Sequence, residues 1–265
     1  ERKGMAAAAM DPVEAAKRAA AEKAVDEFVR DGMVVGIGSG STIVYAVHRL
    51  AARAKLPEGD PLRISTAVFV PTSFQSRQLL AEAGLTVAEL ATREVLDVAI
   101  DGADEVDKSL NCIKGGGGCQ LEEKLVASAA RKFVVVADHR KQSERLGTCW
   151  TKGVPLEIAP SGYRLAMRLL AAKGATATLR MAKSKAGPVV TDGGHFVVDA
   201  HFGGIEDVPA MERWLKAVPG VLETGIFCGM ASKAFFGQAD GSVVEWAADG
   251  NATPVAAAEA GSESA

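Results

Sequence analysis

The chain has 265 residues and a mass of 27.5 kDa, which allows one or two domains, and its 5% aromatic content predicts an aliphatic core. A net charge of −3 and a pI of about 5.9 give no basic footprint for nucleic acid, and no apolar run reaches the ~20 residues of a membrane span. The four cysteines lack CxxC spacing, so we expect free thiols in a reducing compartment and no zinc site.

Strands and helices alternate over the first half of the chain. A helix is predicted from Asp11, its N-cap, to Arg30. The following elements are a strand at 33–37, a helix at 43–53, a strand at 64–70, a helix at 74–83, a short strand from 87, a strand at 95–100, a helix at 121–131 and a strand at 132–137. This order predicts an α/β domain with a Rossmann-like parallel sheet covered on both faces.

A different order follows residue 148. It reads as a strand at 154–159, a helix at 160–172, a strand at 176–182, a strand–turn–strand at 189–199, a helix at 208–217 and a strand at 220–223. This is the ferredoxin-like order. We therefore expect an inserted ferredoxin-like α+β domain at 149–225, within a Rossmann-like domain formed by 10–148 plus 226–247. The Ala-rich start (1–9) and the Ala-, Glu-, Ser- and Gly-rich tail (248–265) are expected to be disordered.

A glycine- and hydroxyl-rich loop, Gly36-Ile37-Gly38-Ser39-Gly40-Ser41-Thr42, follows the first predicted strand. A loop of this kind between a strand and a helix directs backbone N–H groups at an anion. The dinucleotide fingerprint would need a third glycine at position 41 and an acid after the second strand, and a P-loop would need a lysine. A single phosphate monoester fits better, and a tight turn with no ligand stays open.

An acidic loop, Asp101-Gly102-Ala103-Asp104-Glu105, follows the apolar run at 95–100. The pair Asp101 and Asp104 could hold a metal, act as acid and base, or form a solvated turn. The calcium-loop spacing is absent and no histidine is nearby, so we expect no metal. Glu105 and Asp107 are expected to form a solvated face.

The third motif places Lys114 before four glycines, Gly115 to Gly118, and ahead of Glu123. Backbone N–H groups and a cation can stabilise an oxyanion while a carboxylate moves a proton. Glu122 and Glu123 point about 100° apart on a helix, so only one can face the loop. Lys141, at another strand end, could add positive charge. The histidines show no Ser–His–Asp pattern, so triad hydrolysis is not expected.

Together these motifs, with Pro71-Thr72-Ser73-Phe74-Gln75 and a weaker match at Gly187-Pro188-Val189-Val190-Thr191-Asp192, make the chain resemble type A ribose-5-phosphate isomerases in their eukaryotic form. The resemblance covers about residues 17–246. The family pattern also has glutamate followed directly by lysine, which Glu123-Lys124 supplies and which favours Glu123 over Glu122.

The resemblance implies interconversion of D-ribose 5-phosphate and D-ribulose 5-phosphate through a cis-enediolate, without metal or cofactor, in the pentose phosphate pathway. Glu123 would be the general base, Lys114 and the N–H groups of Gly115, Gly116 and Gly117 would hold the enediolate oxygen, and Asp101 would help to open the furanose ring. Asp104 would bind sugar hydroxyls. The phosphate would lie on Ser39, Gly40, Ser41 and Thr42, with charge from Lys141 and from Lys17 or its neighbour Arg18.

The resemblance further implies that the inserted domain is a lid and subunit contact, so a homodimer or homotetramer is expected. We expect a cytoplasmic protein, or one of the chloroplast stroma, with a role in the Calvin cycle, if a transit peptide was removed. The alternative is a sugar-phosphate-sensing domain, which would need neither Lys114 nor Glu123 and would carry a DNA-binding module that is not recognisable here. A nucleotide-dependent oxidoreductase lacks its third glycine and ribose acid.

Overall fold

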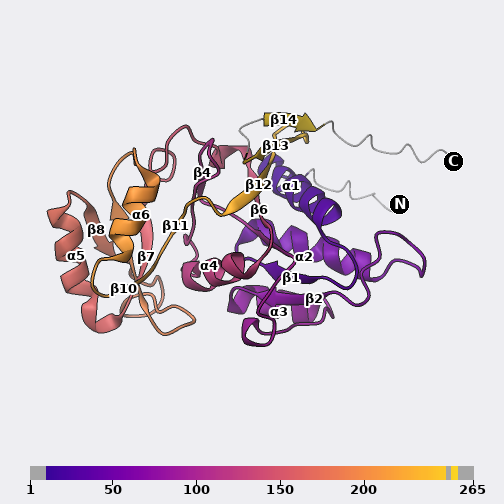
Figure 1. Cartoon of the computed structure of the whole chain (residues 1–265), viewed down its shortest axis with the longest axis horizontal. Coiled ribbons are helices and arrows are strands. Elements are labelled where there is room, and N and C mark those ends of the chain that lie inside the picture. The colour runs from indigo at the N-terminus through magenta and orange to yellow at the C-terminus, as the bar shows by residue number, and fades with distance from the viewer. Residues whose placement is uncertain (1–9, 249–251, 256–265) are drawn as a thin grey trace, which may run out of the picture.

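The computed structural model describes residues 10–248 and 252–255 of the chain, and its central element is a sheet in the order β14–β13–β12–β6–β3–β1–β2 (Figure 1). From β12 to β2 the neighbouring strands are parallel, whereas β13 and β14 are antiparallel. The predicted Rossmann-like α/β class is confirmed. The strands are β1 (Val34–Ile37), β2 (Val68–Pro71), β3 (Val98–Asp101), β6 (Phe133–Asp138), β12 (Ala231–Gly237), β13 (Val243–Ala247) and β14 (Ala252–Val255).

Helices cover both faces of this sheet. Three helices pack on one face: α1 (Pro12–Phe28), α2 (Ser41–Ala54) and α3 (Phe74–Glu82). Helix α4 (Gln120–Ala129) packs on the other face. Alternate side chains of β6 enter the two cores, Val134 on the α1 side and Val135 on the α4 side, as expected of a strand buried on both faces. The N-cap predicted at Asp11 is present, and Ser73 caps the start of α3.

A four-stranded antiparallel sheet in the order β10–β7–β9–β8 forms the inserted unit. The order strand, helix, strand, strand, helix, strand is the predicted ferredoxin-like one. At the predicted hairpin, the segment before the turn is joined to β9 only through a single bridge between Val190 and Phe196. The elements are β7 (Val154–Ile158), α5 (Tyr163–Ala172), β8 (Thr176–Leu179), β9 (Phe196–His201), α6 (Val208–Lys216) and β10 (Val221–Thr224).

A third, small antiparallel sheet joins the two units and was not predicted. It consists of β4 (Glu105–Val106), β5 (Cys112–Ile113) and β11 (Ile226–Phe227). The expectation of a solvated face at Glu105 and Asp107 is wrong, because the two residues are 0% and 8% exposed. The Glu105 carboxylate accepts N–H groups from four consecutive residues at the entrance to the inserted unit, Gly147 to Trp150. Burial of a carboxylate requires such partners.

The ends of the chain differ in part from the expectation of disorder. Residues 1–9, 249–251 and 256–265, within the predicted disordered ends, lie outside the described residues. Ala252–Val255, however, forms β14 and pairs with β13, so the prediction was wrong for these four residues. Composition cannot reveal this pairing, which covers the otherwise open edge of β13. No helix in the described part of the chain is long and apolar enough to cross a membrane.

The parallel strands bring the sequence motifs to one edge of the sheet. Strand β2, which follows β1 in the chain, pairs on one side of β1, and the next strand of this sheet, β3, pairs on the other side. Such a reversal of strand order opens a crevice at the carboxyl ends of the strands. The loops that follow β1, β3 and β6 all lie at this crevice. The loop after β6 begins with a 3₁₀ helix at His139–Lys141. Two further 3₁₀ helices lie at Leu90–Thr92 and Pro160–Gly162.

Candidate active site

Two glycines allow the loop after β1 to lie against its neighbours. A Cβ on Gly38 would lie 1.8 Å from Asp101 Oδ1, and a Cβ on Gly36 would lie 2.4 Å from Val126 Cγ1 on α4. The close approach lets Ser39 N–H donate to Asp101 Oδ1 at 3.1 Å. These glycines therefore serve the packing of the strand and helix, which explains them without a dinucleotide.

The start of α2 presents free backbone and hydroxyl groups. Gly40 is the residue before the helix, with φ of +94°, a conformation that favours glycine. Ser41 and Thr42 form the first turn, and both line a pocket of about 190 Å³ at this edge of the sheet. Gly40 N–H is held by Gln75 Oε1 at 2.8 Å. A helix start of this kind binds anions through its N–H groups and dipole.

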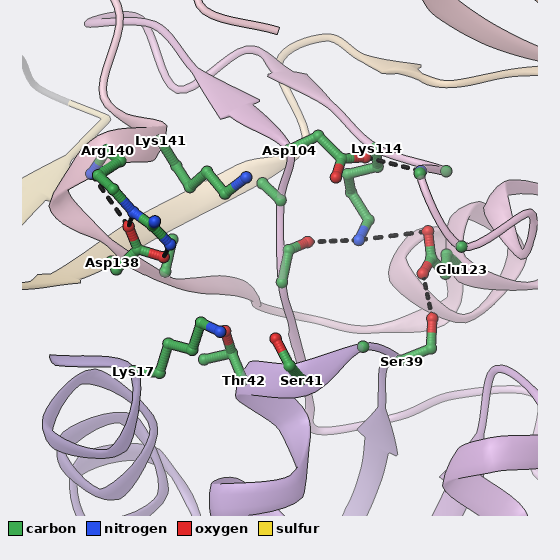
Figure 2. A pocket seen from close by; sticks show the side chains of 17 residues that line it. Lys17, Ser39, Ser41, Thr42, Asp104, Lys114, Glu123, Asp138, Arg140 and Lys141 are labelled. Atoms are coloured by element: carbon green, nitrogen blue, oxygen red, sulfur yellow. Dashed lines mark hydrogen bonds and ion pairs between the residues drawn. The ribbon is translucent and has the colours of Figure 1, made fainter. Parts of the chain in front are cut away.

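Three cations lie at the same end of the pocket (Figure 2). Lys17 from α1 pairs with Glu14 at 2.6 Å, and Arg140 pairs with Asp138 at 2.6 Å. Lys141 has no carboxylate partner among the described residues, and its Nζ lies 5.5 Å from the centre of the Trp150 ring. Lys141 is therefore the cation at this end whose charge is not already compensated by an ion pair.

Lys114, Asp101 and Glu123 form a buried cluster at the opposite end. Lys114 Nζ lies 2.8 Å from Asp101 Oδ2 and 3.3 Å from Glu123 Oε2, and it also donates to the carbonyl of Gly102. Ser39 Oγ donates to Glu123 Oε1 at 2.5 Å. Glu123 is 5% exposed, while Glu122 is half-buried and lines a different hollow beside Asp192. The helix thus turns only Glu123 toward the pocket.

Burial and charge shift the proton affinities in this cluster. Burial, with the charge of Glu123, raises the pKa of Asp101 to about 7, although Lys114 opposes the shift. Burial acts to lower the pKa of Lys114, but the charges of Asp101 and Glu123 outweigh it and raise that pKa. The lysine is therefore a fixed positive charge at neutral pH, whereas Asp101 can exchange a proton.

The glycine loop forms a tight turn over the pocket. Gly118 N–H donates to Gly115 O at 2.9 Å, and Gly116 N–H donates to Asp104 Oδ2 at 2.7 Å. A Cβ on Gly116 would lie 2.6 Å from Asp104 Oδ1, so only glycine permits this approach. Burial raises the pKa of Asp104 despite the bond from Gly116. The carboxyl of Asp104 therefore faces the pocket with an increased tendency to hold a proton.

The pocket brings together the side chains and loop residues that the resemblance assigns to the site, except Asp101 and Arg18. Asp101 pairs with Lys114 and does not line the pocket, and Arg18, the alternative to Lys17, pairs with Glu22. Figure 2 shows the two ends, with Lys17, Arg140 and Lys141 on one side and Lys114 and Glu123 on the other. The predicted residues that line it are Lys17, Ser39, Gly40, Ser41, Thr42, Asp104, Lys114, Gly115, Gly116, Gly117, Glu123 and Lys141.

Other contacts of the site escaped sequence reasoning. Arg180, from the inserted unit, donates to the carbonyls of Gly115 and Gly116, and nothing in its local sequence marks it. Arg140 also lines the pocket and is not among the predicted site residues, although it is the neighbour of Lys141. Within the described ranges, no group of three or more His, Cys, Asp or Glu residues could hold a metal ion.

Comparison with known proteins assigns the family. The family model for ribose 5-phosphate isomerase A (phosphoriboisomerase A) matches residues 68–241. Ribose-5-phosphate isomerase of Dictyostelium discoideum is 51% identical over 229 residues, which are 85% of this chain and 95% of that protein. The human ribose-5-phosphate isomerase is 48% identical over 235 residues, which are 88% of this chain and 74% of that protein.

Solved structures agree in fold. The chain matches ribose 5-phosphate isomerase A of Methanocaldococcus jannaschii with a TM-score of 0.79 and 36% identity, over 87% of this chain and 97% of that one. It also matches a D-ribose-5-phosphate isomerase in complex with phospho-erythronic acid with a TM-score of 0.83 and 39% identity, over 90% of this chain and 100% of that one. The chain belongs to the ribose 5-phosphate isomerase A family of aldose–ketose isomerases.

Proposed function

We propose that this chain interconverts D-ribose 5-phosphate and D-ribulose 5-phosphate by proton transfer through a cis-enediolate, in the pentose phosphate pathway. The observation that carries the proposal is the position of Glu123, a carboxylate at the pocket surface beside the Lys114 ammonium and the Ser39 hydroxyl. A base, a fixed cation and N–H donors around one small pocket are the groups that deprotonation next to a carbonyl requires.

Glu123 acts as the general base. Its carboxylate takes the proton from C2 of the open-chain aldehyde, and the electron pair of that bond forms the C1–C2 double bond as O1 becomes negative. A proton passes from the O2 hydroxyl to O1, and Glu123 then delivers its proton to C1 as O2 becomes the ketone oxygen. The atoms and electrons balance without an oxidant. Ser39 holds one Glu123 oxygen, so the other is oriented for the transfer.

Lys114 and the glycine loop stabilise the enediolate oxygen. The ammonium is positive throughout, since the charges of Asp101 and Glu123 raise its pKa although the side chain is only 2% exposed. In a site with little water its attraction for a developing negative charge is stronger than at a surface. Gly115, Gly116 and Gly117 line the same pocket, and since the Gly116 N–H already donates to Asp104, the Gly115 and Gly117 N–H groups are the further donors.

Asp101 and Asp104 divide the remaining roles. The resemblance assigns ring opening to Asp101, but that carboxylate contacts Lys114 and does not line the pocket. We propose that Asp101 mainly holds Lys114 in place and balances its charge. Asp104 lines the pocket, and its raised pKa suits it to binding sugar hydroxyls and to protonating the ring oxygen when the furanose opens.

The phosphate lies at the other end of the pocket. Ser39, Gly40, Ser41 and Thr42 line this end, and the N–H groups and hydroxyls of Ser41 and Thr42 provide donors for a monoester, with positive charge from Lys141 and Lys17. The N–H groups of Ser39 and Gly40 already donate to Asp101 and Gln75 and hold the loop in place. An open-chain pentose extends from this end toward Lys114 and Glu123. A sensing domain would need only the phosphate end, so the buried cluster of Lys114, Asp101 and Glu123 favours an enzyme.

The proposed mechanism is tested by isotope exchange with EDTA present. With ribose 5-phosphate as the substrate in deuterium oxide, the proton on the Glu123 carboxyl exchanges with solvent during the lifetime of the enediolate, and this puts deuterium on C1 of ribulose 5-phosphate. Transfer of hydrogen as hydride, directly from C2 to C1, would leave the product without solvent deuterium at C1. That result would contradict the enediolate, while the absence of any turnover would favour the sensing domain.

The phospho-erythronic acid bound to the related structure supports the same assignment. It is a phosphorylated four-carbon acid whose planar carboxylate resembles the enediolate end of the intermediate. We expect it to compete with ribose 5-phosphate here, with its phosphate at the α2 end and its carboxylate near Lys114. Inhibition that is not competitive would count against this orientation.

We propose further that the inserted unit is the lid and subunit contact of a homodimer or homotetramer. Large apolar side chains are exposed on this unit, among them Leu165, Met181 and Leu222. Light scattering coupled to size-exclusion chromatography measures the mass directly, and a 27.5 kDa species at working concentration would refute the oligomer. For the compartment we propose the cytoplasm, which the four free cysteines support.

A further inference from the structure

Arg180 links the inserted unit to the glycine loop of the pocket. It directly follows β8, and its Nη1 donates to Gly115 O at 3.0 Å and to Gly116 O at 3.1 Å. Its other nitrogens are used by Asp199 on the neighbouring strand β9, with Nε to Oδ2 at 2.9 Å and Nη2 to Oδ1 at 2.5 Å. The side chains of Arg180 and Asp199 are 18% and 16% exposed.

The two carbonyl bonds fix the direction of the N–H groups across the same peptide planes. In a trans peptide the C=O and the following N–H point in opposite directions. With Gly115 O held by Arg180, the Gly116 N–H points the other way, and it donates to Asp104 at 2.7 Å. The same geometry applies to Gly116 O and the Gly117 N–H, so that N–H also points away from Arg180.

The Gly117 N–H is left without an acceptor. Across the part of the chain that the structure describes, it donates to neither a backbone nor a side-chain oxygen. Gly117 lines the pocket beside Lys114 and Glu123, and a four-glycine turn has little stiffness of its own. A donor on such a turn needs an external contact to hold its direction.

We propose that Arg180 is a positioning residue for the isomerisation. By holding the carbonyls of Gly115 and Gly116, it keeps the Gly117 N–H aimed at the substrate oxygen that becomes negative in the enediolate. This inference rests on the proposed function of the pocket. Asp199 contributes by fixing the plane of the guanidinium, which leaves only Nη1 free for the loop. The inserted unit thereby completes the oxyanion site of the central domain.

Arginine is suited to this position because one planar group makes four directed bonds at once. Lysine in its place could reach either the carboxylate or a carbonyl, but not hold both carbonyls and Asp199 in one plane. The order of activity should therefore be wild type, then Arg180→Lys, then Arg180→Met. Asp199→Asn should lie between wild type and Arg180→Met, because the guanidinium remains but is less firmly oriented.

The test compares the two ends of the pocket in the full chain. Wild type, Arg180→Lys, Arg180→Met, Asp199→Asn and the exposed-arginine control Arg168→Met are assayed for kcat and KM with ribose 5-phosphate, and for inhibition by phospho-erythronic acid and by inorganic phosphate. Loss of a direct oxyanion donor lowers kcat by ~10²–10³-fold, so we expect ~10–100-fold for loss of its support. Phospho-erythronic acid should bind more weakly by a similar factor, and inorganic phosphate should bind unchanged.

The outcomes separate a positioning role from general damage. An unchanged kcat in Arg180→Met, or an equal loss of affinity for phospho-erythronic acid and phosphate, would overturn the proposal. If Arg180→Met does not fold, the graded kcat of Arg180→Lys and Asp199→Asn decides in the same way. Failure of the proposed function is a separate result, since it would appear as no turnover by wild type or as full activity of Glu123→Gln.

Discussion

Replacing Lys114 by methionine tests the buried cluster most severely. In wild type two carboxylates, Asp101 and Glu123, share one ammonium, and all three side chains are at most 6% exposed. Methionine keeps the length of the side chain but leaves both carboxylates buried without a cation. Removing one partner of a buried ion pair costs about 3–5 kcal/mol, and we expect a loss of this size in the free energy of unfolding at pH 8.

The loss should shrink as the pH falls. In wild type the folded-state pKa of Asp101, about 7, already exceeds its ordinary value of 3.8, and Lys114 is among the groups that lower it. Without Lys114 this pKa rises further. A carboxyl whose folded-state pKa is raised stabilises the fold below its unfolded pKa, and this contribution is lost as pH rises through the folded pKa. The variant should therefore be closer to wild type at pH 5 than at pH 8.

The assay is urea unfolding at both pH values and at one protein concentration. Lys108→Met is the matched control, because Lys108 forms an exposed pair with Glu144 in which the side chains are 59% and 84% exposed. We expect the control to change stability by less than about 0.5 kcal/mol. The double variant Lys114→Met/Asp101→Asn should recover part of the loss. Equal stability of wild type and Lys114→Met at pH 8 would refute the reasoning.

Three further predictions concern the pocket and its supports. Lys141→Met should raise KM about 10-fold with little change in kcat, because it removes a phosphate contact that is equal in the ground and transition states. Steady-state kinetics measures both constants, and a fall in kcat would contradict this prediction. Gly38→Ala should lower the free energy of unfolding by about 1–3 kcal/mol and the activity by more than 10-fold, because the alanine Cβ would displace Asp101. Denaturant unfolding measures the stability, and a variant as stable as wild type would contradict this prediction. Glu105→Gln should lower the unfolding free energy by about 2 kcal/mol, measured by urea unfolding, because four backbone N–H groups lose a charged acceptor; an unchanged midpoint would exclude that role.

The order of elements could be predicted because its signals are local. Asp11 and Ser73 mark helix starts by their own side chains, and the ferredoxin-like order follows from spacing alone. The three-stranded sheet of β4, β5 and β11 was missed because its pairs are two residues long and because β11 joins β5 from over 100 positions away. Glu105 was misjudged for the same reason, since its partners at 147–150 are distant in sequence.

The site was predictable where a motif supplied several groups together. The glycine loop, Lys114 and Glu123 occupy one stretch of chain, and the structure gathers them at one pocket with the loop after β1. Asp101 pairs with Lys114, which follows β5, and does not line the pocket; sequence spacing cannot indicate this placement. Arg180 likewise reaches the loop only through the docking of the inserted unit.

The most direct measurement compares Glu123→Gln with Glu122→Gln, its neighbour on the same turn of α4, in the conversion of ribose 5-phosphate to ribulose 5-phosphate. Only Glu123 lines the pocket with Lys114, and glutamine there keeps the size but cannot accept the C2 proton. We predict a fall in kcat of ~10²-fold or more for Glu123→Gln with substrate still bound, and near wild-type kcat for Glu122→Gln. Full activity of Glu123→Gln, or an equal loss in both variants, would contradict the assignment of Glu123 as the base.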